Sequence, residues 1–184
     1  MTRMPYLFLA LVVTLGAGLA GYRLSGGEAF AATTATAAPA DAVARLATLT
    51  LPDPAGRPQL VAQWQGQVRV LNFWATWCPP CRKELPGFAR LSRKFADKGV
   101  QFVGISIDDA DKVQAFREET GIPYPLLIGD TNTLALTAPL GNPTLGLPFT
   151  IVLDRQGKAA LQKTGIVNEG QLDALLSRLA AAPK

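Results

Sequence analysis

From about residue 45 onward, nearly uninterrupted apolar runs recur along the chain. Three of them have the length of a strand, namely VRVLNFW (68–74), VQFVGISI (100–107) and FTIVL (149–153). Such runs are typical of strands that are buried on both faces of a sheet, because neither side of the strand then needs polar residues. The shorter run YPLLIG (124–129) predicts a further extended segment.

Segments with helical periodicity separate these strands. Between residues 79 and 98, apolar side chains recur at steps of three and four, which predicts one helix with a single buried stripe. A second helix is expected after Asp108 or Asp109, either of which can cap it. Asn168, with Gln171 three residues later, predicts the start of a last helix.

Two hairpins complete the pattern. Residues 45–60 and 149–164 each read as a strand, a turn and a returning strand. This order of elements predicts an α/β fold, with a central mixed sheet flanked by helices and an added N-terminal β-hairpin. Cys78 then follows a central strand that ends at Trp74, at the start of a helix, where open α/β sheets place their chemistry.

The first 24 residues have a different character, because Pro5 to Tyr22 carries no charge. As a helix this run would reach roughly 27 Å, close to the ~30 Å hydrocarbon core of a bilayer. We therefore expect residues 1–24 to be an N-terminal transmembrane anchor. The alternative is a signal segment cleaved after Ala31, although Ala31 lies far beyond the end of the apolar run. Either version places the remainder outside the cytoplasm, on the periplasmic side of the inner membrane.

Residues 25–44 are rich in Ala and Thr and lack large apolar side chains. Such a composition predicts a flexible tether, which leaves residues 45–184 as the folded domain.

Composition excludes several classes of function. The chain of 184 residues has 18 basic and 14 acidic side chains without a dense basic run, so we expect no nucleic-acid partner. It contains no histidine, which excludes His-based metal sites and Ser–His or Cys–His catalytic pairs. Its two cysteines cannot close a four-ligand zinc site, so we expect no metal.

The two cysteines, Cys78 and Cys81, are separated by Pro79 and Pro80. A disulfide across so short a loop would stabilise the fold little, because loop-closure entropy grows with loop length. At a helix start, Cys78 is instead placed to react as a thiolate, and Cys81, one turn deeper, can resolve a mixed disulfide. Proline fits the first helical turn, but the two prolines remove two N–H donors, so we expect only a moderate lowering of the Cys78 pKa.

The stretch NFWATWCPPCRKELP (72–86) resembles the active site of the TlpA/ResA-like branch of the thioredoxin superfamily, a group of extracytoplasmic thiol-disulfide oxidoreductases. The resemblance extends over about 45–182 and includes GLPFTIVLDRQGK (146–158). It implies a thioredoxin-like fold, in which Pro86 is the proline that kinks the first helix of the family.

The resemblance also implies roles for other residues. Pro148 matches the cis-proline loop that lies against the cysteine pair, and Leu147 would offer backbone groups to an extended client segment. Glu84 is a candidate proton acceptor for Cys81, because Asn72 stands where thioredoxins carry an acidic relay residue. The alternative is that Glu84 is a solvated carboxylate that pairs with a neighbouring basic residue.

Trp74 and Trp77 flank the cysteines, and we expect one to pack beneath the site and the other to cover it as a client-facing surface.

By resemblance, the function is reduction of disulfides in secreted or cytochrome-maturation clients, with electrons from a membrane thiol donor and no cofactor beyond the redox-active Cys78–Cys81 pair. One alternative is a disulfide-forming oxidant or isomerase, and another is a Cu(I)-handling assembly factor. A third is a peroxidase of the related peroxiredoxin group, but such an enzyme would need a Thr at the position of Ala75.

Overall fold

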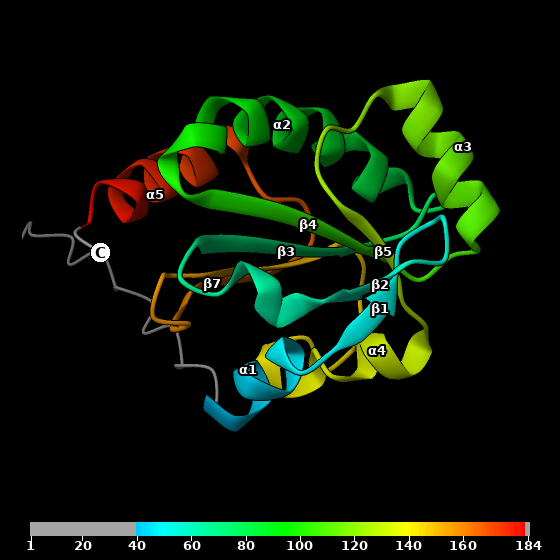
Figure 1. Ribbon diagram of the computed structural model, residues 1–184, viewed down its shortest axis with the longest axis horizontal. Helices are drawn as coiled ribbons and strands as arrows, with labels where there is room; N and C mark the ends of the chain where they lie inside the picture. The colour runs from blue at the N-terminus through cyan, green and yellow to red at the C-terminus, as the bar shows by residue number, and fades with distance from the viewer. Residues whose placement is uncertain (1–39, 183–184) are drawn as a thin grey trace, which may run out of the picture. The chain divides into compact units, whose positions relative to one another are not determined.

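The computed structural model describes residues 40–182 (Figure 1). Within this range, no helix has both the length and the apolar character that crossing a bilayer requires. The expected anchor, the cleavage site at Ala31 and most of the expected tether lie outside the described residues.

A five-stranded mixed sheet forms the centre of the described part, in the order β5–β4–β3–β6–β7. Its strands are β3 (Val68–Trp74), β4 (Val100–Ser106), β5 (Leu126–Ile128), β6 (Phe149–Leu153) and β7 (Ala159–Thr164). Strands β3, β4 and β5 are parallel, whereas β6 runs antiparallel to both β3 and β7. This is the mixed sheet that the apolar runs predict, and every residue of β3 is buried.

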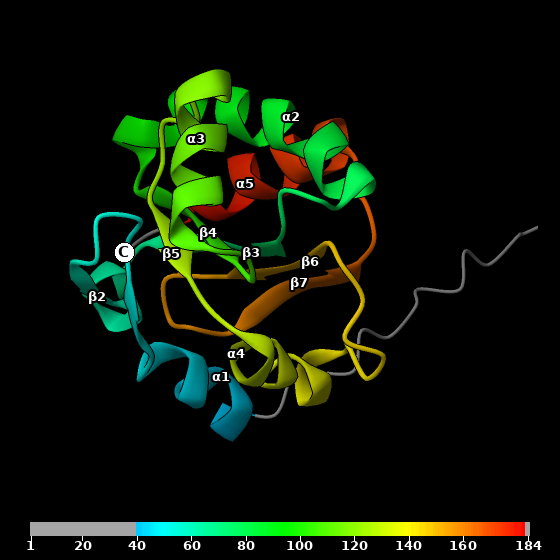
Figure 2. The same cartoon turned by 90° about the vertical axis from the view of Figure 1, so that its right-hand side faces the viewer.

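Helices cover both faces of this sheet (Figures 1 and 2). One face carries α2 (Pro79–Phe95), α3 (Ala110–Thr120) and α5 (Glu169–Ala181), and the other carries α1 (Ala40–Ala47) and α4 (Thr131–Ala135). Short 3-10 turns extend these elements: η1 (Val61–Trp64), η2 (Ala96–Lys98) and η3 (Ala138–Leu140). Each face of the sheet has its own apolar core, as expected for strands buried on both sides.

The folded part begins earlier than the sequence pattern predicts. Residues 40–44, which were expected in the tether, form the first half of α1. Its Ala42 and Leu46, four residues apart and so on one helical face, are buried in the core on that side of the sheet. The expected hairpin follows as β1 (Thr50–Pro52) and β2 (Pro58–Leu60), which pair with each other in a separate two-stranded sheet.

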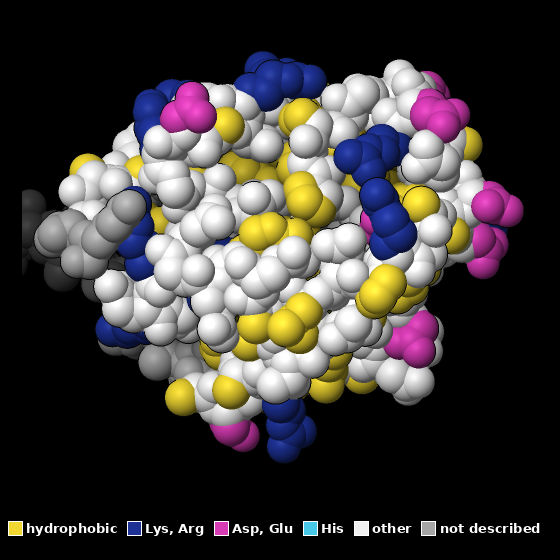
Figure 3. All heavy atoms as spheres, viewed as in Figure 1, with side chains coloured by type: hydrophobic (Ala, Val, Ile, Leu, Met, Phe, Trp, Pro, Cys, Tyr) yellow, Lys and Arg dark blue, Asp and Glu magenta, His cyan; other side chains and the backbone are white. Residues whose placement is uncertain are grey.

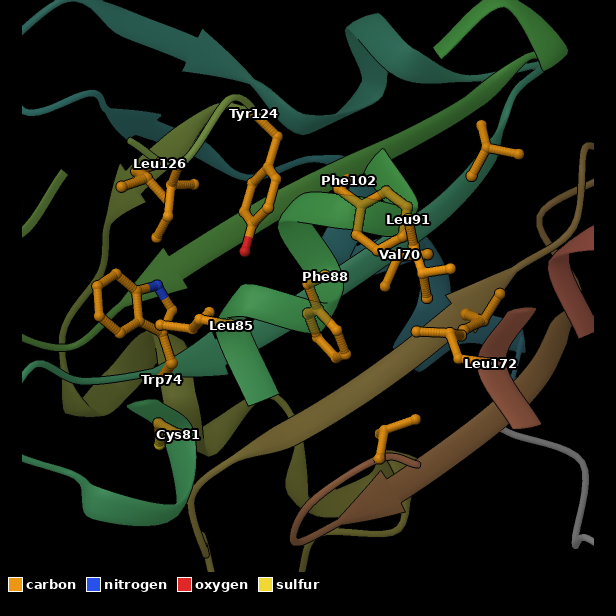
Figure 4. Close-up of a cluster of buried hydrophobic side chains, with 14 of the residues drawn as sticks. Val70, Trp74, Cys81, Leu85, Phe88, Leu91, Phe102, Tyr124, Leu126 and Leu172 are labelled. Atoms are coloured by element: carbon orange, nitrogen blue, oxygen red, sulfur yellow. The ribbon is translucent and has the colours of Figure 1, made fainter. Parts of the chain in front are cut away.

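Helix α2 starts and ends where its sequence predicts. Pro79 and Pro80 occupy its first turn, where their missing N–H groups cost no helical hydrogen bond. After η2 the chain leaves through Gly99 in the left-handed conformation, with a φ of 71°. The apolar stripe of α2 packs with β3 and β4, and the close-up shows Leu85 beside Trp74, with Phe88 and Leu91 near Phe102 (Figure 4).

The charges are dispersed over the face of the molecule shown in Figure 3. Two Lys or Arg side chains touch in the upper right of this view, the other basic side chains are scattered, and no continuous basic surface is visible on that face.

Candidate active site

Cys78 and Cys81 form a disulfide at the start of α2, with their Cα atoms 5.3 Å apart. Cys78 is the residue that caps the helix, and its Sγ accepts a hydrogen bond of 3.3 Å from the backbone N–H of Cys81. Cys78 is 4% exposed and Cys81 is 0% exposed. Both cysteines belong to the apolar cluster beneath the helix, in which Figure 4 shows Cys81, and Cys78 is the more exposed of the two.

The two prolines limit how many donors surround the Cys78 sulfur. Pro79 and Pro80 have no N–H, so the N–H of Cys81 is the first one that the helix can offer. A thiolate at this position is stabilised by that donor and by the positive end of the α2 dipole.

The peptide bond between Leu147 and Pro148 is cis. Phe149, the first residue of β6, pairs with Phe73 near the end of β3, so Pro148 lies at the end of the sheet from which the chain continues to Cys78. The C=O of Pro148 accepts a hydrogen bond of 2.8 Å from Gly165. Within residues 40–182, neither the N–H nor the C=O of Leu147 has a backbone partner, which leaves both groups for an extended segment.

A fully buried asparagine that sequence reasoning missed holds the loop before Pro148. Asn142 donates from Nδ2 to Thr137 Oγ1 (2.9 Å) and to the C=O of Gly146 (3.1 Å). Its Oδ1 accepts from the N–H of Gly146 (2.9 Å) and from Thr164 Oγ1 (3.2 Å). The signal in the sequence is an Asn in a Gly- and Pro-rich stretch, where its side chain can replace backbone partners.

Glu84 is buried rather than solvated. Its side chain accepts a hydrogen bond of 2.8 Å from Asn72 Nδ2 and another of 3.0 Å from the backbone N–H of Val167, and the residue is 5% exposed. Burial raises the pKa of Glu84 to about 7, although these two hydrogen bonds oppose the change. The alternative of a solvated carboxylate is therefore wrong, and Glu84 lies one helical turn after Cys81 on the same side of α2.

Asn72 connects this carboxyl group to the sheet. Its Nδ2 also donates to Thr150 Oγ1 at 3.0 Å, from the neighbouring strand β6, while its Oδ1 has no hydrogen-bond partner within the described residues. Thr150 and Val167 were missed by sequence reasoning. Thr150 is directly opposite Asn72 in the β3–β6 register, which cannot be read before the strands are paired.

One of the two tryptophans is buried and the other is exposed, as expected. Trp74 is fully buried against Phe116, with ring centroids 5.1 Å apart, whereas Trp77 is 62% exposed next to Cys78. Trp77 is thus an apolar surface beside the accessible sulfur. Trp74 is part of the core that supports the site.

The turn that carries Thr76 is tied to the next loop. Thr76 Oγ1 donates to Asp108 Oδ2, and Asp108 also accepts from the N–H of Asp109 (2.9 Å) and from Lys112 Nζ (3.3 Å). Burial raises the pKa of Asp108, but these hydrogen bonds outweigh burial and lower it. Asp109 occupies the capping position of α3 without a side-chain bond, so Asp108 anchors this junction instead.

The described residues were also compared with the requirements of a metal site. Between residues 40 and 182, no group of three or more His, Cys, Asp or Glu side chains is placed to hold an ion.

Comparison with known proteins agrees with this geometry. Residues 43–162 match the model of the AhpC/TSA family. The chain is 32% identical over 116 residues to the thiol-disulfide oxidoreductase ResA of Bacillus thuringiensis, and the match covers 62% of this chain and 65% of that relative. The chain thus spans just under two thirds of the relative's length.

Solved structures give the same fold. A secreted thiol-disulfide isomerase from Corynebacterium glutamicum is 27% identical with a TM-score of 0.67, over 74% of this chain and 86% of that one. A thiol:disulfide interchange protein of the thioredoxin family from Chlorobium tepidum is 25% identical with a TM-score of 0.63, over 72% and 93%. The described part therefore has a thioredoxin-like α/β fold.

Proposed function

This chain belongs to the AhpC/TSA family, and we propose that it is an extracytoplasmic thiol-disulfide oxidoreductase that reduces disulfides in client proteins. The observation that carries the proposal is the Cys78–Cys81 disulfide at a helix start, in which Cys78 is slightly more exposed than Cys81, at the end of the sheet where Pro148 also lies. The similarity to the thiol-disulfide oxidoreductase ResA of Bacillus thuringiensis supports it.

In the first step, the Cys78 thiolate attacks one sulfur of the client disulfide. The client S–S bond breaks, a mixed disulfide forms and one client thiolate leaves and takes up a proton. In the second step, Cys81 loses its proton and attacks the Cys78 sulfur, which releases the second client thiolate and forms the Cys78–Cys81 disulfide. Two electrons have then moved from the dithiol to the client.

Glu84 is suited to accept the Cys81 proton. Its pKa of about 7 is close to neutral pH, which is the most useful value for a group that must both take and return a proton. Asn72 and Val167 hold the carboxyl group from two different segments, so its position does not depend on α2 alone.

Client recognition is assigned to Trp77, Leu147 and Pro148. The exposed indole of Trp77 offers apolar contact beside Cys78, and the unpaired backbone groups of Leu147 can bind an extended client segment as an added strand. The proposed clients are cytochrome-maturation proteins or other secreted proteins that contain disulfides.

The proposed cycle needs an external electron donor, because two cysteines cannot reduce themselves. A membrane thiol protein would reduce Cys78–Cys81 by the reverse exchange. The uncharged run from Pro5 to Tyr22 supports a membrane-anchored form on the periplasmic side, where such a donor would be within reach.

The test is the reduction potential of the Cys78–Cys81 couple, measured by equilibrating the protein with a glutathione or dithiothreitol buffer. A value near or below about −250 mV agrees with a reductase, whereas a value near about −120 mV belongs to strong oxidants. The latter would favour the oxidant or isomerase alternative, which the similarity to the secreted thiol-disulfide isomerase of Corynebacterium glutamicum also suggests.

A trapping experiment tests the roles of the two sulfurs. Cys81→Ser should accumulate a mixed disulfide with a model client, because the resolving thiol is missing. Cys78→Ser should form none under the same conditions. Equal trapping by both variants would contradict the assignment of Cys78 as the attacking sulfur.

A further inference from the structure

An open cavity of about 570 Å³ lies at the end of β3 remote from Cys78. Helix α1 forms one wall, and the turn between β6 and β7 forms another. Its volume is within the range of sites that bind small molecules. The cavity shares no residue with the candidate active site.

The lining of this cavity combines three cations with an apolar wall. Arg69, Arg155 and Lys158 line it, and no Asp or Glu of residues 40–182 does. The apolar wall is built from small side chains, namely Ala40, Val43, Ala44, Ala47 and Ala159. A ligand that matches both features carries a negative charge on a small apolar body.

Arg69 is the least expected of the three cations, because it lies within a central strand and is only 3% exposed. Its Nε is buried without a hydrogen-bond partner, and Arg69 makes no ion pair among residues 40–182. A buried charge without a partner is costly, and proteins normally supply one.

The neighbouring groups compensate the buried charge of Arg69 only in part. Asp154 is the acidic residue whose charge acts on it, but the Oδ1 of Asp154 already accepts hydrogen bonds from the N–H groups of Gln156 (3.0 Å) and Lys158 (2.8 Å). Arg155, in contrast, donates to the carbonyl groups of Leu179 and Ala182 (3.1 and 2.9 Å). Among the described residues, Arg69 is therefore the buried cation of this cavity that has no hydrogen-bond or ion-pair partner, whereas Lys158 is exposed to solvent.

We propose that this cavity binds a small organic carboxylate. The carboxylate accepts hydrogen bonds from the guanidinium of Arg69 and attracts the exposed Lys158, while the apolar body of the ligand packs on the Ala and Val side chains of α1. Binding at this place is independent of the cysteine pair and of the proposed reductase activity.

Hexanoate is a suitable probe, with hexanamide as its neutral counterpart and inorganic phosphate as an anion without an apolar body. The full chain, labelled with nitrogen-15, is titrated with each compound while the Nε–Hε signal of Arg69 is followed by NMR. Saturable movement of this signal with hexanoate alone is expected. Equal movement with hexanamide would overturn the role of the charge, and equal movement with phosphate would overturn the role of the apolar wall.

Two variants and a control complete the test. Arg69→Gln should weaken hexanoate binding about tenfold to a hundredfold, as expected for loss of hydrogen bonds to a charged group. Lys158→Gln, at an exposed position, should weaken it about twofold to fivefold. Lys163→Gln, an exposed lysine outside the cavity, should leave it unchanged. Equal hexanoate affinity in all variants would overturn the proposal. If Arg69→Gln does not fold, the test rests on the hexanoate affinity of Lys158→Gln and on the movement of the Arg69 Nε–Hε signal in the wild-type protein.

Discussion

Asn72 in β3 donates a hydrogen bond of 2.8 Å to the carboxyl group of Glu84 in α2, and so joins the sheet to the helix that carries the cysteines. The bond lies in a buried region, where an ionised carboxylate is poorly solvated. The pKa of Glu84 is therefore raised to about 7 in the folded protein.

This raised pKa predicts how stability changes with pH. Below pH 4.5, Glu84 is neutral in both the folded and the unfolded chain. Between pH 4.5 and about 7 the unfolded chain loses the proton while the folded protein retains it, so the free energy of unfolding falls as pH rises. The loss attributable to Glu84 is on the order of 3 kcal/mol.

Chemical denaturation of the oxidised protein at pH 4 and pH 8 measures this loss. Wild type should lose more stability across the range than Glu84→Gln, whose side chain does not titrate. Glu119→Gln, at an exposed position of α3, should behave like wild type. Parallel pH dependences for wild type and Glu84→Gln would contradict the buried, protonated carboxyl group.

The same group predicts the pH profile of exchange. If Glu84 accepts the Cys81 proton, it must be ionised, so the rate at which a Cys78–client mixed disulfide resolves should rise with pH through about 7. Glu84→Gln should lower the rate at pH 8 about a hundredfold and remove the inflection. Stopped-flow measurement of client release gives both quantities, and an unchanged inflection in the variant would assign it to another group.

Asn142→Ala should damage the loop that leads to Pro148. The variant removes four hydrogen bonds from a buried position, so we expect a loss of about 2–4 kcal/mol in the free energy of unfolding and a higher KM for a client disulfide. Asn132→Ala, at an exposed position, should change stability by less than about 0.5 kcal/mol. A KM for Asn142→Ala equal to that of wild type would show that the loop does not position the client.

Arg155→Gln should weaken the end of α5. The guanidinium of Arg155 donates to carbonyl groups in the last turn of that helix and to Lys98. Their loss should cost about 1–3 kcal/mol, measured by thermal or denaturant unfolding. Arg178→Gln removes a cation from the same helix end, and Arg178 makes no side-chain hydrogen bond within residues 40–182. A similar loss in that variant would attribute the effect to charge alone.

The sheet and its main helices could be predicted because their signals are local. The continuous apolar run of β3 and the spacing of Leu85, Phe88 and Leu91 each identify an element without knowledge of its neighbours. Helix α1 was not predicted, because only Ala42 and Leu46 mark its buried face. Its first residues are also as rich in Ala as the segment before them.

The candidate site was predictable only where the residues are close in sequence. Cys78, Cys81 and Glu84 lie within two helical turns, so their shared position could be expected. Thr150 and Val167 meet this group through strand pairing and through the approach of α5, which no local pattern encodes. The same applies to Arg69, whose lack of a partner becomes visible only once α1 and the β6–β7 turn are in place.

The antiparallel pairing of β6 with β3 determines when the site forms as the protein folds. Because β6 begins where β3 ends, Pro148 comes to the same end of the sheet as Cys78 only after two segments far apart in the sequence have paired in register. Such non-local pairing is a slow step in folding. A newly made chain therefore carries two neighbouring thiols before it carries a site that positions them, and selective exchange is acquired at the end of folding.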